Sequence, residues 1–222
     1  MINGYTFQWQ VVTDHLPALL LGAWYDVWVS LVGFVLACAL GLLLALCRLS
    51  GLRALAWPSL TYVQVVRAIP PYVLLLWFHF GVSRLLGVAF TPLQSIVVVL
   101  AISGAGYAAE IFRSGIAAID RGQIEAGRSL GFSRFSIYAD IVLPQAFRIV
   151  IAPLGNVMVG LLKSATLMGV IAVPDLLHVA QGLNVNYFAP FEAFTAVLAI
   201  FVTLVFVLAL LILAIERAVA HP

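Results

Sequence analysis

Charged residues are scarce in this chain. Asp, Glu, Lys and Arg together make up 9% of its 222 residues, whereas 64% are hydrophobic, and the mean hydropathy is +1.14. This composition excludes an ordinary soluble domain, because such domains carry about 25% charged residues. We therefore predict an all-α membrane protein that crosses the bilayer several times. The net charge of +2 gives no indication of a nucleic-acid partner.

Several chemical features are also missing. The two cysteines, Cys38 and Cys47, fall within one apolar stretch, so the sequence indicates no disulfide framework. His79 has no second histidine or cysteine at metal-binding spacing, so we expect neither a metal nor another cofactor on this chain. No G-x-x-x-x-G-K-[ST] phosphate-binding loop is present. We therefore expect that the chain is not an enzyme and has no ATPase site of its own, so any ATP hydrolysis must occur on another polypeptide.

The apolar residues gather in stretches long enough to span a bilayer, which takes about 20 residues each. Five such stretches are present: Trp24–Cys47, Leu60–Val82, Pro92–Ala109, Pro144–Ala172 and Ala193–Ile215. The segment 1–23 before the first of them contains Trp9 beside polar residues, which is typical of an outer interfacial segment. It lacks the basic region and the cleavage site of a signal peptide, so we expect it to be retained.

Basic residues are distributed unevenly between the two sides of the predicted spans. Those on one side are Arg48, Arg53, Arg113, Arg121, Arg128, Arg134, Arg148 and Arg217, whereas Arg84 is alone on the other. The positive-inside rule then places the N-terminus outside the cytoplasmic membrane, and the loop 111–144 and the C-terminus inside. We predict a transmembrane domain over 24–217 and a cytoplasmic tail over 218–222.

The cytoplasmic loop contains a short helix with strong start and stop signals. Asp120 and Gln123 form an acidic variant of the capping box, which predicts a helix beginning at Arg121. Gly131 is suited to the left-handed position that ends a helix, so the predicted helix is Arg121–Leu130. The loop has no role in crossing the bilayer, and we interpret it as a docking device.

The rest of the loop supports that interpretation. The small residues Ala126 and Gly127 would let another protein approach the backbone closely, and Glu125 and Arg128 offer charge around the contact. A second helix is expected after Ser133, whose hydroxyl can cap it. Pro144 is expected to open the next long helix, because proline is favoured at a first helical position.

Ionisable residues inside the predicted spans are candidates for the transport pathway. Asp26 lies at the outer end of the first span, where it is either a solvated helix-end carboxylate or a gate or substrate contact. Arg67 precedes Pro70-Pro71, which must break the second span. Arg67 either fixes that break by pairing with a carboxylate or freed carbonyls, or contacts substrate.

Two further groups of polar residues occur at helical spacing. Glu110 and Arg113 are three residues apart and share a helix face, which favours a structural ion pair over a role in transmitting loop movement. Lys163, Ser164 and Thr166 follow in the fourth span. Their ammonium and hydroxyl groups suit either a substrate carboxylate or a contact between helices across a dimer.

Four stretches of this sequence resemble those of one family. Glu125-Ala126-Gly127, Gly131 and Ile141-Val142-Leu143-Pro144 have the spacing of the EAA loop of bacterial ABC-importer permeases, with Gly127 in place of the second alanine. The stretches from Tyr62 to Pro71 and from Gly104 to Gly115 are similar to strings of the polar-amino-acid subfamily, as is the stretch from Lys163 to Leu167. Ala68, Ile69, Ala165 and Thr166 depart from those strings.

The resemblance implies a type I importer permease of MetI-like fold with about five transmembrane helices. Such a subunit translocates a polar amino acid or a derivative such as an opine across the bacterial inner membrane. Its partners are a second permease subunit, identical or similar, two cytoplasmic ATPases and an extracytoplasmic solute-binding protein. Gln123, Glu125, Ala126, Gly127, Arg128, Gly131 and Pro144 would couple the permease to the ATPase.

Two other classes of membrane protein are alternatives to this one. An ion-coupled secondary carrier also contains broken spans and buried charges. A membrane-embedded enzyme would need clustered catalytic groups, but Lys163 and Ser164 are adjacent and do not face each other on a helix.

Overall fold

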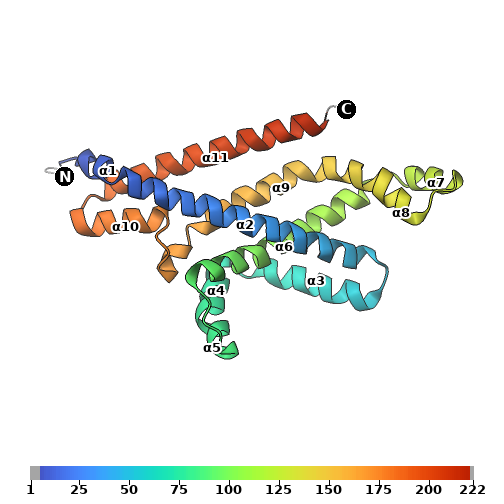
Figure 1. Cartoon of the computed structure of the whole chain (residues 1–222), viewed down its shortest axis with the longest axis horizontal. Helices are drawn as coiled ribbons and strands as arrows, with labels where there is room; N and C mark the ends of the chain where they lie inside the picture. The colour runs from blue at the N-terminus through green and yellow to red at the C-terminus, as the bar shows by residue number, and fades with distance from the viewer. Residues whose placement is uncertain (1–5, 221–222) are drawn as a thin grey trace. The chain divides into compact units, whose positions relative to one another are not determined.

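The structure is a computed structural model, and it describes residues 6–220. The first residues of the predicted outer segment, 1–5, and the end of the predicted tail, 221–222, lie outside the described residues. Every regular element between them is helical (Figure 1). The predicted all-α fold class is therefore confirmed.

Among residues 6–220, four helical runs are long and apolar enough to cross a membrane. They are α2 (Leu16–Leu49), α6 (Pro92–Ala117), the run from α8 through η2 to α9 (Arg134–Ala165), and α11 (Pro190–Ala220). A fifth crossing results if the broken run from Arg53 to Leu86 counts as one span. The expectation of about five spans is consistent with this count.

The second predicted span is broken where the two prolines occur. Helix α3 (Arg53–Ala68) ends before Ile69, whose backbone is extended, and α4 (Pro71–Leu76) begins at the second proline. The chain then continues through the π-helix η1 (Trp77–Val82) into α5 (Ser83–Leu86). Because a residue before proline avoids the helical region, the dipeptide forces this break, as the sequence predicted.

Other span boundaries differ from the predicted ones. Helix α2 begins at Leu16 rather than Trp24, so it takes in the end of the segment that the sequence assigned to the interface. Helix α6 continues past Ala109 to Ala117. Polar side chains at the ends of a helix do not stop it, because they can reach water while the backbone keeps its hydrogen bonds.

The prediction that Pro144 opens a new helix is wrong. The chain is already helical from α8 (Arg134–Ser136) through the π-helix η2 (Ile137–Val142) into α9 (Leu143–Ala165). In η2 the amide of Leu143 donates to the carbonyl of Tyr138. This wider π turn makes room for the Pro144 ring, which would otherwise clash with the carbonyl four residues earlier, so the helix passes through the proline.

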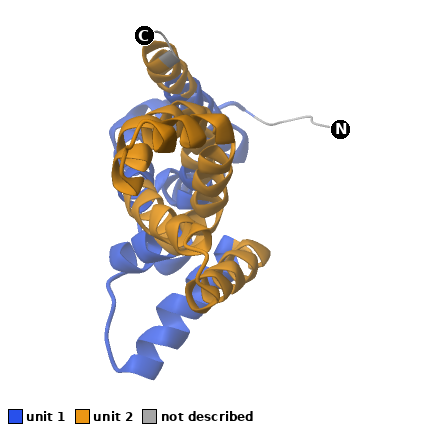
Figure 2. Ribbon diagram, turned by 90° about the vertical axis from the view of Figure 1, so that its right-hand side faces the viewer, with its two compact units in different colours: residues 1–33, 71–100, 161–208 blue, residues 34–70, 101–160, 209–222 orange. Residues whose placement is uncertain are grey.

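The chain divides into two compact units, and the division falls inside its long helices. Unit 1 comprises residues 1–33, 71–100 and 161–208, and unit 2 comprises residues 34–70, 101–160 and 209–222 (Figure 2). In unit 2, a Cβ on Gly41 would lie 2.6 Å from the Cβ of Ala108. Small residues thus let α2 and α6 pack closely in this unit, as expected of helices in lipid.

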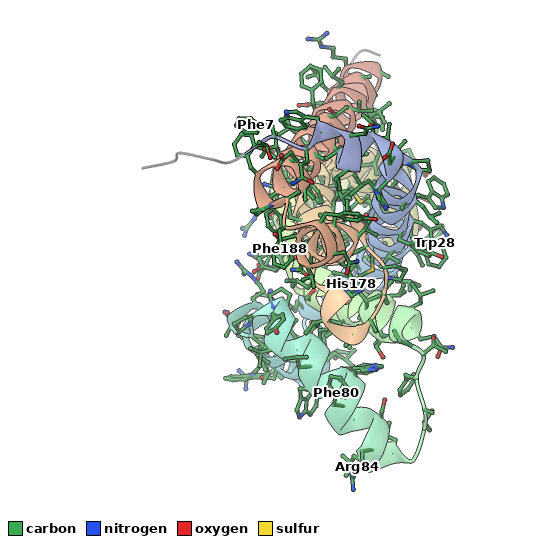
Figure 3. The ribbon with its side chains drawn as sticks, turned by 90° about the vertical axis from the view of Figure 1, so that its left-hand side faces the viewer. Phe7, Trp28, Phe80, Arg84, His178 and Phe188 are labelled. Carbon is green, nitrogen blue, oxygen red and sulfur yellow. The ribbon has the colours of Figure 1, made fainter. Side chains whose placement is uncertain are left out.

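Unit 1 has a core of small and aliphatic residues from α2, α10 (Leu176–Tyr187) and α11. The buried members are Leu19, Ala23, Leu176, Ala180, Leu183, Ala193 and Ala196. The short helix α1 (Trp9–Asp14) precedes α2, and the ring centroids of Trp9 and Phe191 are 6.1 Å apart. Exposed aromatic residues, among them Phe7, Trp28 and Phe188, lie on the outside of this unit (Figure 3).

Candidate coupling segment and buried polar groups

The docking helix predicted in the loop is present as α7 (Arg121–Ser129). The carboxylate of Asp120 accepts a hydrogen bond from the amide of Gly122 at 2.6 Å and caps the first turn. At the other end the amide of Phe132 donates to the carbonyl of Gly127, and that of Gly131 to Arg128, each at 3.0 Å. Gly131 has φ +81°. This is a Schellman ending, which only a residue tolerant of the left-handed region supports at low cost.

Helix α7 lies back against η2 (Figure 1). Ile119, Ile137, Val142 and Ala146 form a buried cluster, against which Ile116 and Ile124 pack. Ile119, just before the helix, and Ile124, within it, thus hold the start of α7 against this cluster. The predicted second cap forms too, because the Ser133 hydroxyl accepts from the amide of Ser136 at 3.1 Å. These contacts attach α7 firmly to the helical run that leads into α9.

Gly127 faces this cluster and is buried. A Cβ placed on it would lie 3.1 Å from Cγ1 of Ile137 and 3.2 Å from Cδ1 of Ile141. The expectation that Gly127 receives another protein is therefore wrong. The small residue is needed for packing against the chain's own η2, a contact that only the tertiary structure reveals.

The remaining coupling candidates are exposed on the surface. Gln123, Glu125, Ala126 and Arg128 are all exposed, as is Gly131 in the following turn. Pro144 is also exposed, within α9. The structure thus offers one exposed face on a short helix that is anchored on its other side.

The predicted ion pair between Glu110 and Arg113 is present. Nε of Arg113 donates to Oε2 of Glu110 at 3.0 Å. Arg48, at the end of α2, also binds Glu110 through Nη1 and Oε1. The sequence indicated only a role in membrane orientation for Arg48. Because Arg48 is far from Glu110 along the chain, no local pattern in the sequence indicates that the two residues pair.

The partner of Arg67 is neither a carboxylate nor a freed carbonyl, the two partners that the sequence predicted for a structural role. Its guanidinium carbon lies 5.1 Å from the centroid of the Tyr107 ring. Within residues 6–220 it forms neither an ion pair nor a hydrogen bond with a carboxylate or with the carbonyls freed at the break. The side chain is exposed, so the cation lies over the aromatic face while remaining accessible.

Asp26 is fully buried in unit 1, with a relative exposure of 0%. The interpretation as a solvated helix-end carboxylate is therefore wrong. Because α2 begins at Leu16, Asp26 lies inside the helix rather than at its end. Its Oδ2 accepts from the amide of Leu176 at 3.3 Å, while Oδ1 is buried and has no hydrogen-bond partner among the described residues.

The hydrogen bond between Asp26 and Leu176 joins α2 to the start of α10. A Cβ on Gly22 would lie 2.7 Å from the amide nitrogen of Leu176, so only glycine permits this approach. Asp175 caps α10 by accepting from the amide of His178 at 2.6 Å, and it also accepts from Gly169 at 2.8 Å. Burial raises the pKa of Asp175 above its ordinary value, although these amide hydrogen bonds oppose the shift.

Lys163, Ser164 and Thr166 lie at the C-terminal end of α9 and just beyond it. Lys163 is exposed, and its carbonyl accepts from the Thr166 hydroxyl at 2.8 Å. A cation in the last turn interacts favourably with the helix dipole. The expected roles in a substrate pathway or in a contact across a dimer remain predictions.

The fold and the anchored loop helix define a membrane-embedded transport subunit. The chain belongs to the family of inner membrane components of binding-protein-dependent transport systems, whose model matches residues 37–221. This finding confirms the family that the EAA-like spacing indicated. It also gives no support to the secondary carrier or to the membrane enzyme.

Curated relatives of this chain are permease subunits of ABC transporters. The chain is 34% identical to the probable amino-acid ABC transporter permease protein YckA of Bacillus subtilis strain 168, over 82% of this chain and 81% of the relative. It is 29% identical to the glutamine transport system permease protein GlnP of Escherichia coli K12, over 95% and 97%.

Solved structures agree with the fold. The crystal structure of an amino acid ABC transporter with histidines superposes with a TM-score of 0.89 at 27% identity, covering 96% of this chain and all 100% of that chain. An inward-facing structure of the MetNI methionine ABC transporter superposes with a TM-score of 0.76 at 23% identity, over 93% and 98%. The MetI-like permease fold is thereby confirmed.

Proposed function

We propose that this chain is the membrane pathway subunit of an importer for a polar amino acid or a close derivative. It imports its substrate across the bacterial inner membrane, and ATP hydrolysis on a separate polypeptide drives the transport. The relatives named above, a probable amino-acid permease and a glutamine permease, support this substrate class. The observation that carries the coupling role is the exposed face of α7, which is anchored to the helical run entering α9.

The proposed assembly has two permease subunits and two ATPases that bind ATP and Mg²⁺ on the cytoplasmic side. A solute-binding protein delivers substrate on the outer side. The arginine-rich side of the spans, including the loop with α7, is then cytoplasmic and the N-terminus is outside. This orientation puts α7 in the compartment that contains ATP.

The mechanism follows from the way α7 is attached. When two ATPases close on ATP, they displace the exposed face of α7. The contact of Gly127 with Ile137 transfers that displacement to η2, and the continuous helix carries it through Pro144 into α9. The cavity between subunits then opens outward, and hydrolysis reverses the movement.

Of the pathway candidates, Arg67 and Lys163 remain accessible and suit a substrate carboxylate. Asp26 has no exposed surface in this conformation. Its hydrogen bond to the start of α10 favours a role in an outer gate over direct binding of substrate.

Site-specific cross-linking tests the docking role. A cysteine at Ala126, in a chain whose Cys38 and Cys47 are replaced by serine, should form a cross-link with the co-expressed ATPase subunit. A cysteine at Gln181 of α10, also exposed, is the control on the proposed outer side and should not. If Ala126→Cys never captures the ATPase, the docking role is lost.

Uncoupling variants test the same role by transport. Gly131→Val forces a β-branched residue into the left-handed region, and Glu125→Lys reverses a charge on the exposed face. Both variants should insert into the membrane and lose uptake in proteoliposomes. Normal uptake in both would count against the proposal.

A further inference from the structure

A small polar pocket opens between α7 and the helical run that follows it. Its volume is about 180 Å³, and it is lined by Ile124, Arg128, Arg134, Ile137 and Tyr138. All five residues belong to unit 2. The pocket has room for a side-chain carboxylate together with a few water molecules, each of which occupies about 30 Å³ in the liquid.

The two arginines of this pocket lack counter-ions. Neither Arg128 nor Arg134 forms an ion pair with a residue in the described part of the chain. The first turn of α8 contains no acidic residue that would offset the charge of Arg134. In contrast, Arg48 and Arg113 both form ion pairs with Glu110. Two unpaired guanidinium groups around one concavity make a site that favours an anion.

The surface around the pocket indicates what carries that anion. Leu130, Phe132 and Phe135 are exposed nearby in the chain, with relative exposures of 76%, 46% and 81%. A free phosphate ion would gain nothing from such apolar surface. An anionic membrane is usually bound by a cluster of about four or more basic residues, whereas this surface also carries the exposed carboxylates of Glu125 on α7 and Asp140 on η2. Mixed charges beside exposed aromatic residues suit a protein surface.

We propose that this pocket receives an aspartate or glutamate side chain of the ATPase subunit, bound between Arg128 and Arg134. The inference rests on the proposed function and extends it, because it assigns the chemistry of one contact at the docking surface. A guanidinium pair can hold a carboxylate through several charge-assisted hydrogen bonds, and the Tyr138 hydroxyl offers another donor. Partial enclosure by Ile124 and Ile137 strengthens such a contact by excluding water.

The test measures the affinity of the cognate ATPase for the permease in nanodiscs of neutral lipid. Arg128→Gln with Arg134→Gln should weaken binding about tenfold and reduce its dependence on salt. Reversing both charges to glutamate should weaken it further. Arg121→Gln is the matched control, because Arg121 is exposed on the same helix but does not line the pocket.

The outcomes separate this inference from the function on which it rests. If the unmodified permease binds the ATPase and the double variant binds equally well, the pocket has no such role while the docking function stands. If the unmodified permease never binds the ATPase, both are wrong. If the double substitution weakens ATPase binding only in nanodiscs that contain anionic lipid, and not in nanodiscs of neutral lipid, the occupant of the pocket is a lipid headgroup. The inference is then overturned.

Discussion

Gly127 of α7 packs against Ile137 of η2 so closely that a Cβ on Gly127 would come within 3.1 Å of Ile137 Cγ1. The docking helix is therefore attached to the next membrane helix through a position that has no side chain. Glycine lowers helix propensity by about 1 kcal/mol relative to alanine. The structure shows what offsets this cost, namely the close packing of α7 on η2.

We expect Gly127→Val to separate α7 from η2. The larger side chain would overpack the contact and cost about 1–3 kcal/mol, so ATP hydrolysis should continue without uptake. Gly160→Ala is the control, because a Cβ at Gly160 meets nothing within 4 Å. Uptake and ATPase activity in proteoliposomes measure the effect, and coupled transport by Gly127→Val would contradict it.

The two arginines that bind Glu110 should contribute unequally to the stability of the fold. The side chain of Arg48 is 15% exposed, whereas that of Arg113 is 36% exposed. Water screens the more exposed pair, which should therefore contribute less than about 1 kcal/mol. Thermal unfolding in nanodiscs should show a larger loss of stability for Arg48→Met than for Arg113→Met. Equal losses would mean that exposure does not set the strength of these pairs.

Replacement of Asp26 should show how much its hydrogen bond to Leu176 contributes to stability. Asp26→Asn keeps an oxygen that can accept from the Leu176 amide, and it replaces the ionisable carboxyl group, whose Oδ1 has no partner among the described residues, with a neutral amide. We expect it to be more stable than Asp26→Ala by about 1–3 kcal/mol, because alanine leaves the Leu176 amide without that acceptor. Thermal unfolding of the two variants provides the measurement. Equal stability of the two would show that the hydrogen bond contributes nothing.

The stability of unit 1 should depend on the protonation of Asp175. Its folded-state pKa is raised by burial, so its contribution is most favourable below the ordinary value of 3.8 and is lost as pH rises through the folded-state value. Asp175→Asn keeps a capping oxygen for His178 and does not titrate. The stability advantage of Asp175→Asn over the unmodified chain should therefore grow from about pH 4 upward. Unfolding midpoints of both proteins across this range test the sign, and an advantage that shrinks with pH would contradict it.

Much of the coupling segment follows from local sequence. Asp120, Ser133 and Gly131 act within one or two helical turns, so their types and spacing were sufficient to predict the caps and the end of α7. The same spacing did not reveal which face of α7 is buried. Ala126 and Gly127 were assigned one role from size alone, but the structure turns Ala126 outward and Gly127 toward Ile137.

The sequence alone determined the membrane class, the break at Pro70-Pro71 and the bounds of the docking helix to within one residue. Hydropathy, proline geometry and helix caps act over short stretches of chain, so they can be read without a fold. Only the tertiary structure decided that Arg48 joins Glu110, that Asp26 is buried against Leu176, and that Arg67 lies over Tyr107. These contacts join residues far apart in the chain, and their partners are set by helix packing, which leaves no periodic signal in the sequence.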